Sequence, residues 1–198
     1  MDMYKEEWTR LQTEIFRFLC MKAGHRLNLR EIARALKVSP TAVSNALKLL
    51  EKQEIIKIKR SQPFNLFSIE LNRDNPKVIQ LKRVENLRQI YESGLHNFLF
   101  NEFPGCTIVL FGSYSLGEDT WFGLPTESRS DIDIAIIGSD RKEINLSNFE
   151  KILLREININ FYKTWKDMHI YLKSNLLGGI LLSGSFDLWS RQKPSKNM

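Results

Sequence analysis

The first part of the chain changes from a helical to a strand periodicity, and this order restricts its fold more than any other sequence feature. Apolar residues at spacings of three and four predict helices over residues 8–22, 29–37 and 41–50. Ser39 is expected to cap the third helix, and Pro40 fits its first turn. The β-rich stretches 55–60 and 66–71 predict a hairpin with its tip at 61–65. Two helices joined by a short turn and followed by a hairpin indicate a helix-turn-helix with a wing.

This block resembles the winged helix-turn-helix of archaeal and bacterial transcription regulators, whose third helix enters the major groove while the wing follows the backbone. The resemblance implies that residues of the third helix and its cap face base edges: Ser39, Thr41, Ser44, Asn45 and Lys48. It implies that residues of the wing contact phosphates: Lys57, Lys59, Arg60 and Gln62. Short polar side chains favour major-groove readout of duplex DNA over base stacking. Duplex RNA is the lesser rival, and a dimerisation or linker module is the alternative without nucleic acid.

Charge and composition narrow the choice of partner and compartment. Residues 1–100 carry 18 Lys and Arg against 11 Asp and Glu, whereas residues 101–198 carry 11 against 12, which favours a polyanionic partner for the first half. A hydrophobic content of 42% excludes a disordered chain. No apolar run approaches membrane-spanning length, so no membrane partner is expected. Cys20 and Cys106 are distant in sequence and are interpreted as reduced core residues, which predicts a cytoplasmic protein.

A connecting segment follows the wing. Asp74-Asn75-Pro76 predicts a helix start, and helical spacing from Val78 to Phe98 predicts one long helix that ends before Pro104-Gly105. Lys82, Arg83 and Arg88 are expected on its solvated face. The chain is thereby divided into a winged-helix domain, residues 1–73, and a second domain, residues 74–198.

The second domain contains the pattern with the most chemical content. The apolar run 106–111 predicts a buried strand that leads directly into Gly112-Ser113. Residues 130–137 predict another strand, on which Asp131 and Asp133 project from the same face. Two adjacent carboxylates repel each other unless a cation neutralises them, and Mg²⁺ suits such oxygen ligands.

This pattern, a strand followed by a Gly-Ser turn and a second strand with Asp-x-Asp, resembles that of the nucleotidyltransferase superfamily to which DNA polymerase β belongs. The resemblance is closest to the minimal prokaryotic members of that superfamily. The resemblance implies an α+β fold with a small mixed sheet. It implies that a nucleotide is bound by Gly112, Ser113, Gly117 and Ser130, and that Asp131 and Asp133 are catalytic ligands of two Mg²⁺ ions. The implied reaction transfers a nucleoside monophosphate from a triphosphate to an acceptor hydroxyl. Archaeal proteins that fuse a winged helix to such a domain are the nearest likeness. Helical toxin–antitoxin partners and homodimers are the protein partners that the two resemblances imply.

Two departures from the family pattern favour a second hypothesis. Twelve residues, Glu118–Arg129, separate Gly117 from Ser130, about twice the usual loop. The family's third carboxylate has no clear counterpart on the expected strand 155–161, where Glu156, Asn158 and Asn160 share a face and Glu156 is the catalytic candidate. The alternative is therefore a transcription regulator with an inactive, nucleotide-sensing domain. Residues 146–154 predict a helix, and helical spacing continues over 172–181 with close packing or a turn at Gly178-Gly179.

Overall fold

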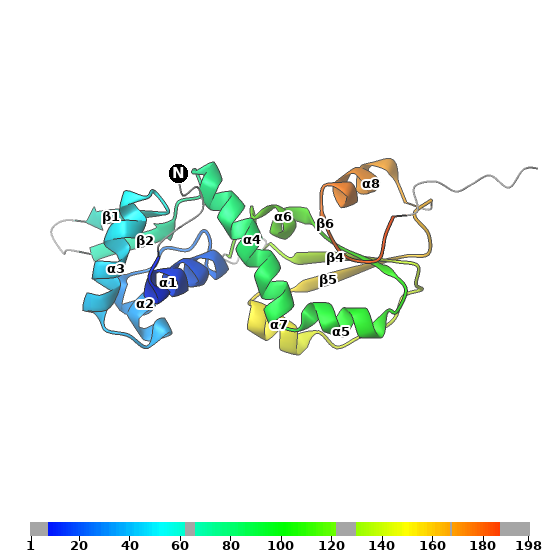
Figure 1. Cartoon of the computed structure of the whole chain (residues 1–198), viewed down its shortest axis with the longest axis horizontal. Helices are drawn as coiled ribbons and strands as arrows, with labels where there is room; N and C mark the ends of the chain where they lie inside the picture. The colour runs from blue at the N-terminus through cyan, green and yellow to red at the C-terminus, as the bar shows by residue number, and fades with distance from the viewer. Residues whose placement is uncertain (1–7, 62–65, 122–129, 167, 187–198) are drawn as a thin grey trace, which may run out of the picture.

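The computed structural model describes residues 8–61, 66–121, 130–166 and 168–186 (Figure 1). Its N-terminal part consists of three helices and a hairpin, as the sequence predicts. The elements are α1 (Arg10–Met21), α2 (Leu29–Leu36), α3 (Pro40–Lys52), β1 (Ile56–Ser61) and β2 (Leu66–Leu71). The two strands pair in antiparallel register from Ile56↔Leu71 to Ser61↔Leu66. This order of elements is a winged helix.

Capping side chains fix where α2 and α3 begin. The Asn28 side chain accepts hydrogen bonds from the amides of Arg30 and Glu31 and starts α2. Ser39 Oγ accepts from the amide of Ala42, and Pro40 occupies the first turn of α3. The Ser39 cap predicted from the sequence is therefore confirmed.

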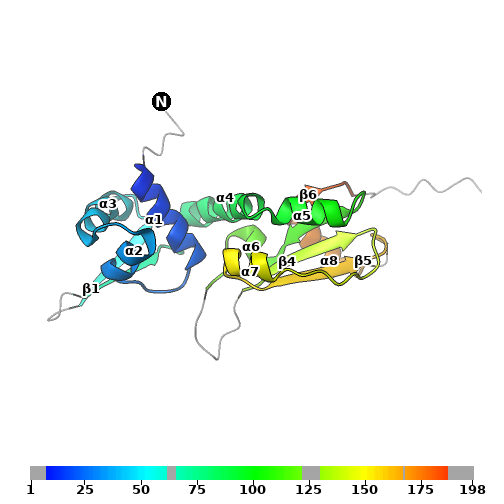
Figure 2. The same ribbon diagram turned by 90° about the horizontal axis from the view of Figure 1, so that it is seen from below.

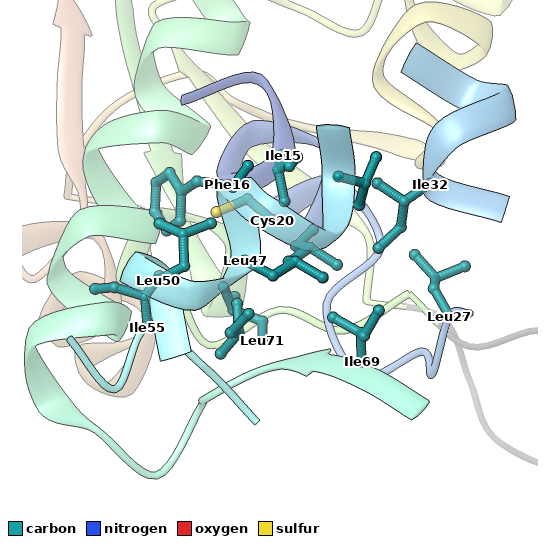
Figure 3. Close-up of a cluster of buried hydrophobic side chains, with 14 of the residues drawn as sticks. Ile15, Phe16, Cys20, Leu27, Ile32, Leu47, Leu50, Ile55, Ile69 and Leu71 are labelled. Carbon is teal, nitrogen blue, oxygen red and sulfur yellow. The ribbon is translucent and has the colours of Figure 1, made fainter. Parts of the chain in front are cut away.

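One hydrophobic core holds the winged helix together. Apolar side chains from α1, α2 and α3 converge on the hairpin and on the loop before α2 (Figure 3). Ile15, Ile32, Leu50, Ile55 and Ile69 are fully buried there. Burial of this kind stabilises by about 1.5–3 kcal/mol for each large aliphatic side chain.

The prediction of one long connecting helix is wrong, because the chain forms two helices here. Helix α4 (Pro76–Glu92) ends at Ser93, and α5 (Leu95–Glu102) starts after Gly94. Gly94 has a φ of +81°, a left-handed conformation that terminates a helix. The helical spacing also predicts that Val84 and Tyr91 lie on the buried face of this helix, but both are exposed. The break lets α5 turn to cover the sheet of the second domain (Figure 2).

The second domain is built on a mixed sheet, as predicted; the sheet has four strands, and helices cover both of its faces. After α5 the elements are β3 (Thr107–Phe111), α6 (Gly112–Leu116), β4 (Ile132–Ile137), α7 (Ser147–Leu153), β5 (Ile157–Tyr162), α8 (Ile170–Leu177) and β6 (Ile180–Ser183). The strand order is β5-β4-β3-β6, in which β4 and β5 are parallel and the other pairs are antiparallel.

Alternation along β4 places different residues on the two faces of the sheet. Ile132, Ile134 and Ile136 pack with buried residues of α5 and α7, whereas Ala135 and Ile137 pack with Leu176 of α8. Asp131 and Asp133 therefore share the face on which α8 lies (Figure 1). That face of the sheet positions the candidate site.

The helical pattern expected over residues 172–181 is also wrong at its end. Helix α8 stops at Leu177, and Ile180 and Leu181 belong to the edge strand β6. A Cβ on Gly179 would lie 2.5 Å from the carbonyl oxygen of Leu110, so this position packs directly on β3. The glycine pair makes the turn that was one of the two expected alternatives.

None of the helices among the described residues combines the length and the hydropathy that crossing a bilayer requires.

Candidate nucleic-acid interface and candidate nucleotide site

The outer face of α3 is polar and open to solvent. Val43, Ala46, Leu47 and Leu50 point into the core. The residues that the winged-helix resemblance assigned to base edges are all exposed: Ser39, Thr41, Ser44, Asn45 and Lys48. The structure therefore gathers these residues on one accessible surface, as helical spacing predicts.

The predicted phosphate contacts of the wing differ in exposure and in their partners. Lys59 is exposed on β1, and Arg60 follows it on the same strand. Lys57 instead forms an ion pair with Asp74, and this hydrogen bond lowers the pKa of the Asp74 carboxyl. Gln62 lies outside the described residues. Among the predicted wing contacts whose side chains the structure describes, Lys59 is therefore the exposed one and fits a phosphate contact.

Three further basic residues lie on α2 or at its C-terminal cap and were not predicted as contacts. Arg30, Arg34 and Lys37 are exposed, while Ile32 and Ala33 on the same helix are buried. The helical period that identified the buried stripe also identifies these outward positions. They add positive charge to the domain that carries the face of α3.

Comparison with known proteins bears on this domain. Residues 9–63 match the sequence model of the MarR family. The N-terminal domain is therefore a MarR-like winged helix. The match ends before α4, so it gives no information on the second domain or on the archaeal fusion proteins. No curated protein matches the chain.

Several solved structures are similar to part of the chain. ZitR from Lactococcus lactis, a zinc-responsive MarR family member, is 25% identical over 52% of this chain and 68% of its own, with a TM-score of 0.38. The adhesin competence repressor AdcR from Streptococcus pyogenes is 21% identical over 52% and 71%, with a TM-score of 0.39. MepR of S. aureus, solved as a DNA complex, is 21% identical over 48% and 78%, with a TM-score of 0.36.

The candidate nucleotide site begins where β3 passes directly into α6. Gly112, at this transition, has a φ of +71°, a conformation that side chains other than glycine rarely adopt. A Cβ built on Gly112 would lie 2.7 Å from Oδ2 of Asp133. Glycine is therefore required here for the Asp133 carboxylate to approach the turn, which brings together the two predicted halves of the site.

The carboxylates of Asp131 and Asp133 are only partly compensated by neighbouring groups. Asn158 lies opposite Asp133 in the parallel β4–β5 register, and its amide donates a 2.9 Å hydrogen bond to Oδ2 of Asp131. Burial and the negative charge of Asp131 raise the pKa of Asp133, although a hydrogen bond from Asn158 opposes the shift. An elevated carboxyl pKa beside a second carboxylate indicates a site that a cation would stabilise.

A third carboxylate does not join this pair among the described residues. Glu156 is exposed just before β5, and no cluster of three or more metal-ligating side chains forms in the part of the chain that the structure describes. Asn158 occupies the strand position beside the pair. Two carboxylates and an amide fit one Mg²⁺ ion that keeps water and phosphate ligands, but they do not supply the ligands for the two ions implied by the resemblance.

Two of the remaining predicted nucleotide contacts, Gly117 and Ser130, also contact other parts of the chain. A Cβ on Gly117 would lie 2.5 Å from the carbonyl oxygen of Ile79 and 2.8 Å from the amide nitrogen of Arg83, so this glycine packs on the backbone of α4. Ser130 Oγ accepts a 3.0 Å hydrogen bond from the amide of Thr120. Ser113 remains beside Gly112 at the start of α6.

The expectation of a solvated Lys82 is wrong. Lys82 and Asp119 are both fully buried and form an ion pair, and Asp119 Oδ2 also accepts a 3.0 Å hydrogen bond from Arg155. Burial lowers the pKa of Lys82, although the charge of Asp119 opposes that shift. Sequence reasoning missed this group because Asp119 lies outside any periodic segment and because nothing local indicates that Arg155, at the start of the expected strand 155–161, meets it.

Proposed function

We propose that this protein is a DNA-binding transcription regulator whose C-terminal domain binds a nucleoside triphosphate together with Mg²⁺. The observation that carries the proposal is the exposed polar face of a capped α3 in a MarR-like winged helix. Short polar side chains on such a helix can reach base edges in the major groove. The exposed basic residues of α2 and the wing add the charge that phosphate contacts require.

The nucleotide part of the proposal is supported by the turn at Gly112 and the carboxylates that approach it. Asp131 and Asp133 would hold one Mg²⁺ ion, and the Gly112-Ser113 turn would face the phosphates. The ion supplies positive charge that offsets both the carboxylates and the triphosphate. The residues of this chain hold and orient the ligand, and a nucleotide-sensing role follows.

Nucleotidyl transfer is the second candidate function. The close approach of Asp133 to the Gly-Ser turn favours it, because a carboxylate proposed to hold metal then lies beside the turn proposed to hold phosphate. Asn158 opposes it, since an amide beside the pair cannot accept a proton at neutral pH as a carboxylate can. Binding without transfer is therefore the function we propose.

Duplex binding is tested first with the full chain. Fluorescence anisotropy with a labelled duplex should show affinity that falls steeply with salt, because counterions are released from neutralised phosphates. Lys59→Ala should weaken binding and reduce the slope of log K against log salt by about one, as the loss of one phosphate contact would. Lys151→Ala, an exposed lysine on α7, is the matched control and should change neither value. A slope near zero for the unaltered protein would contradict the DNA assignment.

Nucleotide binding is tested by calorimetry with ATP, GTP, CTP and UTP, each with and without Mg²⁺. Metal-dependent binding should be lost in Asp131→Asn and retained in Asp140→Asn, which replaces an exposed carboxylate of the same domain. Incubation with α-labelled triphosphate then separates sensing from transfer. Label that becomes covalently attached to protein or nucleic acid in an Asp131-dependent manner would favour the second candidate.

A further inference from the structure

The segment Gly117–Trp121, called the strap here, leaves the candidate nucleotide site and runs between the two domains. It follows α6 directly. Successive residues of the strap contact the winged helix, α4 and the residue that precedes Asp131. The strap therefore contacts the winged-helix domain and the residue next to the proposed nucleotide site.

At its centre, Asp119 joins three elements through a buried polar network. Oδ1 of Asp119 is bonded by Lys82 and, at 2.6 Å, by Asn86, both from α4. Oδ2 accepts from Arg155, which lies two residues before β5. All of these side chains are at most 3% exposed. A carboxylate shared in this way fixes the strap to α4 and to the sheet.

The residues of the strap before and after Asp119 form hydrogen bonds with the winged-helix domain. Arg73 donates a 3.0 Å hydrogen bond to the carbonyl oxygen of Glu118. The amide of Trp121 donates at 2.7 Å to the carbonyl oxygen of Ala23, in the loop after α1. The centroid of the Trp121 ring lies 3.4 Å from Nζ of Lys22, and the ring meets His25 edge-on. The strap therefore has backbone and side-chain contacts with the loop after α1.

Thr120 connects the strap to the candidate nucleotide site. Its amide donates to Ser130 Oγ at 3.0 Å, and its carbonyl oxygen accepts from the Ser130 amide at 3.4 Å. Ser130 directly precedes Asp131. Ser130 Oγ also lies 3.5 Å from Thr120 Oγ1, where either hydroxyl can donate. When Thr120 is the donor, the Ser130 proton can go to a phosphate, and that donation would strengthen the bonds that Ser130 accepts.

We propose that the strap couples nucleotide binding at the Gly112–Asp133 site to DNA binding by the winged helix. A phosphate that engages the Ser130 hydroxyl tightens the Thr120–Ser130 link, and the strap transmits this to the loop after α1 through Trp121. The nucleotide thereby favours one placement of the winged helix relative to the sheet. This inference depends on the nucleotide site proposed above, and it assigns that site a regulatory output.

The coupling is measured by titrating a labelled duplex with the full chain, with and without a saturating triphosphate and Mg²⁺. A triphosphate that binds should change duplex affinity at least about fivefold, and saturating duplex should change triphosphate affinity by the same factor. Triphosphate binding with unchanged duplex affinity would overturn the coupling and leave the proposed function intact. Failure of all four triphosphates to bind would instead overturn the nucleotide site, and the coupling with it.

Variants of the strap contacts separate coupling from binding. Trp121→Ala and, independently, Arg73→Ala should leave each ligand's own affinity within about twofold while reducing the coupling factor toward one. Tyr171→Ala removes an exposed aromatic residue of α8 that makes none of these contacts, and it should preserve the full factor. If either strap variant binds both ligands with full coupling, the strap is not the route and the proposal fails.

Discussion

Two regions of this protein place carboxylates close to other chain segments, but they compensate the negative charge in opposite ways. At the strap, Asp119 is fully buried and receives bonds from Lys82, Asn86 and Arg155. At the Gly112 turn, called the open site here, Asp131 and Asp133 lie near each other, and the side-chain amide of Asn158 is their hydrogen-bond donor. The difference teaches that the charge of the strap carboxylate is compensated within the fold, whereas the paired carboxylates repel each other until a cation binds.

Removing the strap carboxylate should have the largest effect. Asp119→Ala leaves the charges of Lys82 and Arg155 buried without a counterion, and loss of one partner from such a pair typically costs about 3–5 kcal/mol. Urea unfolding followed by circular dichroism measures this change. The corresponding variant at the open site, Asp131→Ala, should change the free energy of unfolding by less than about 1 kcal/mol. Equal losses at the two positions would remove the distinction between the regions.

A methyl group at the turn should produce the next largest effect. Gly112→Ala places its Cβ against Asp133 Oδ2 in a backbone conformation that already disfavours alanine. We expect a loss of about 1–3 kcal/mol in stability and of at least about tenfold in triphosphate affinity, measured by thermal unfolding and calorimetry. Gly105→Ala is the matched control, because its φ of +79° is similar but its Cβ would meet nothing within 4 Å. If both variants bind triphosphate normally, the turn is not the phosphate site.

Acidification should reverse cation binding at the open site. The pKa of Asp133 is raised, so this carboxyl takes up its proton at a higher pH than an ordinary aspartate. Because Mg²⁺ needs the ionised form, affinity should decrease as pH falls through the raised pKa, by about tenfold per unit below it. Calorimetry of Mg²⁺-triphosphate binding at successively lower pH from about pH 7 provides the measurement, and the ordinary aspartate pKa of about 4 sets the lower end of the range. Affinity that stays constant over this range would exclude Asp133 as a ligand.

Local pattern was sufficient to predict most of the fold. The apolar spacing of α1, α2 and α3, the Ser39 cap and the strands β3, β4 and β5 follow from rules that act within a few residues, whereas β6 was expected to be helical. The errors occur where tertiary contacts decide. Gly94 breaks the connecting helix so that α5 can cover the sheet, and Gly179 follows the end of α8 because its backbone packs against Leu110.

In the candidate site, too, local pattern predicted some features, and tertiary contacts decided the others. Alternation on β4 predicted that Asp131 and Asp133 share a face, and the parallel register places Asn158 beside them. The burial of Lys82 could not be predicted, since its partner Asp119 is distant in sequence and belongs to no periodic segment. A lysine on an otherwise amphipathic helix is usually solvated, and only a long-range counterion changes that outcome.

Neutralising one carboxylate of the open site should give the smallest change in stability. This change should be a gain, whereas the change at the strap is a loss. Since the folded-state pKa of Asp133 is raised, the folded protein holds this proton more tightly than the unfolded chain, so stability is lost as pH rises through that window. Asp133→Asn removes the ionisation and the repulsion by Asp131. Without metal, its Tm at neutral pH should exceed that of the unaltered protein by about 1–2 °C, small because solvent screens a half-buried group. The gain should vanish near about pH 3, where both proteins are neutral at this position. A lower Tm for Asp133→Asn at neutral pH would mean that this carboxylate, like Asp119, is already compensated by the fold.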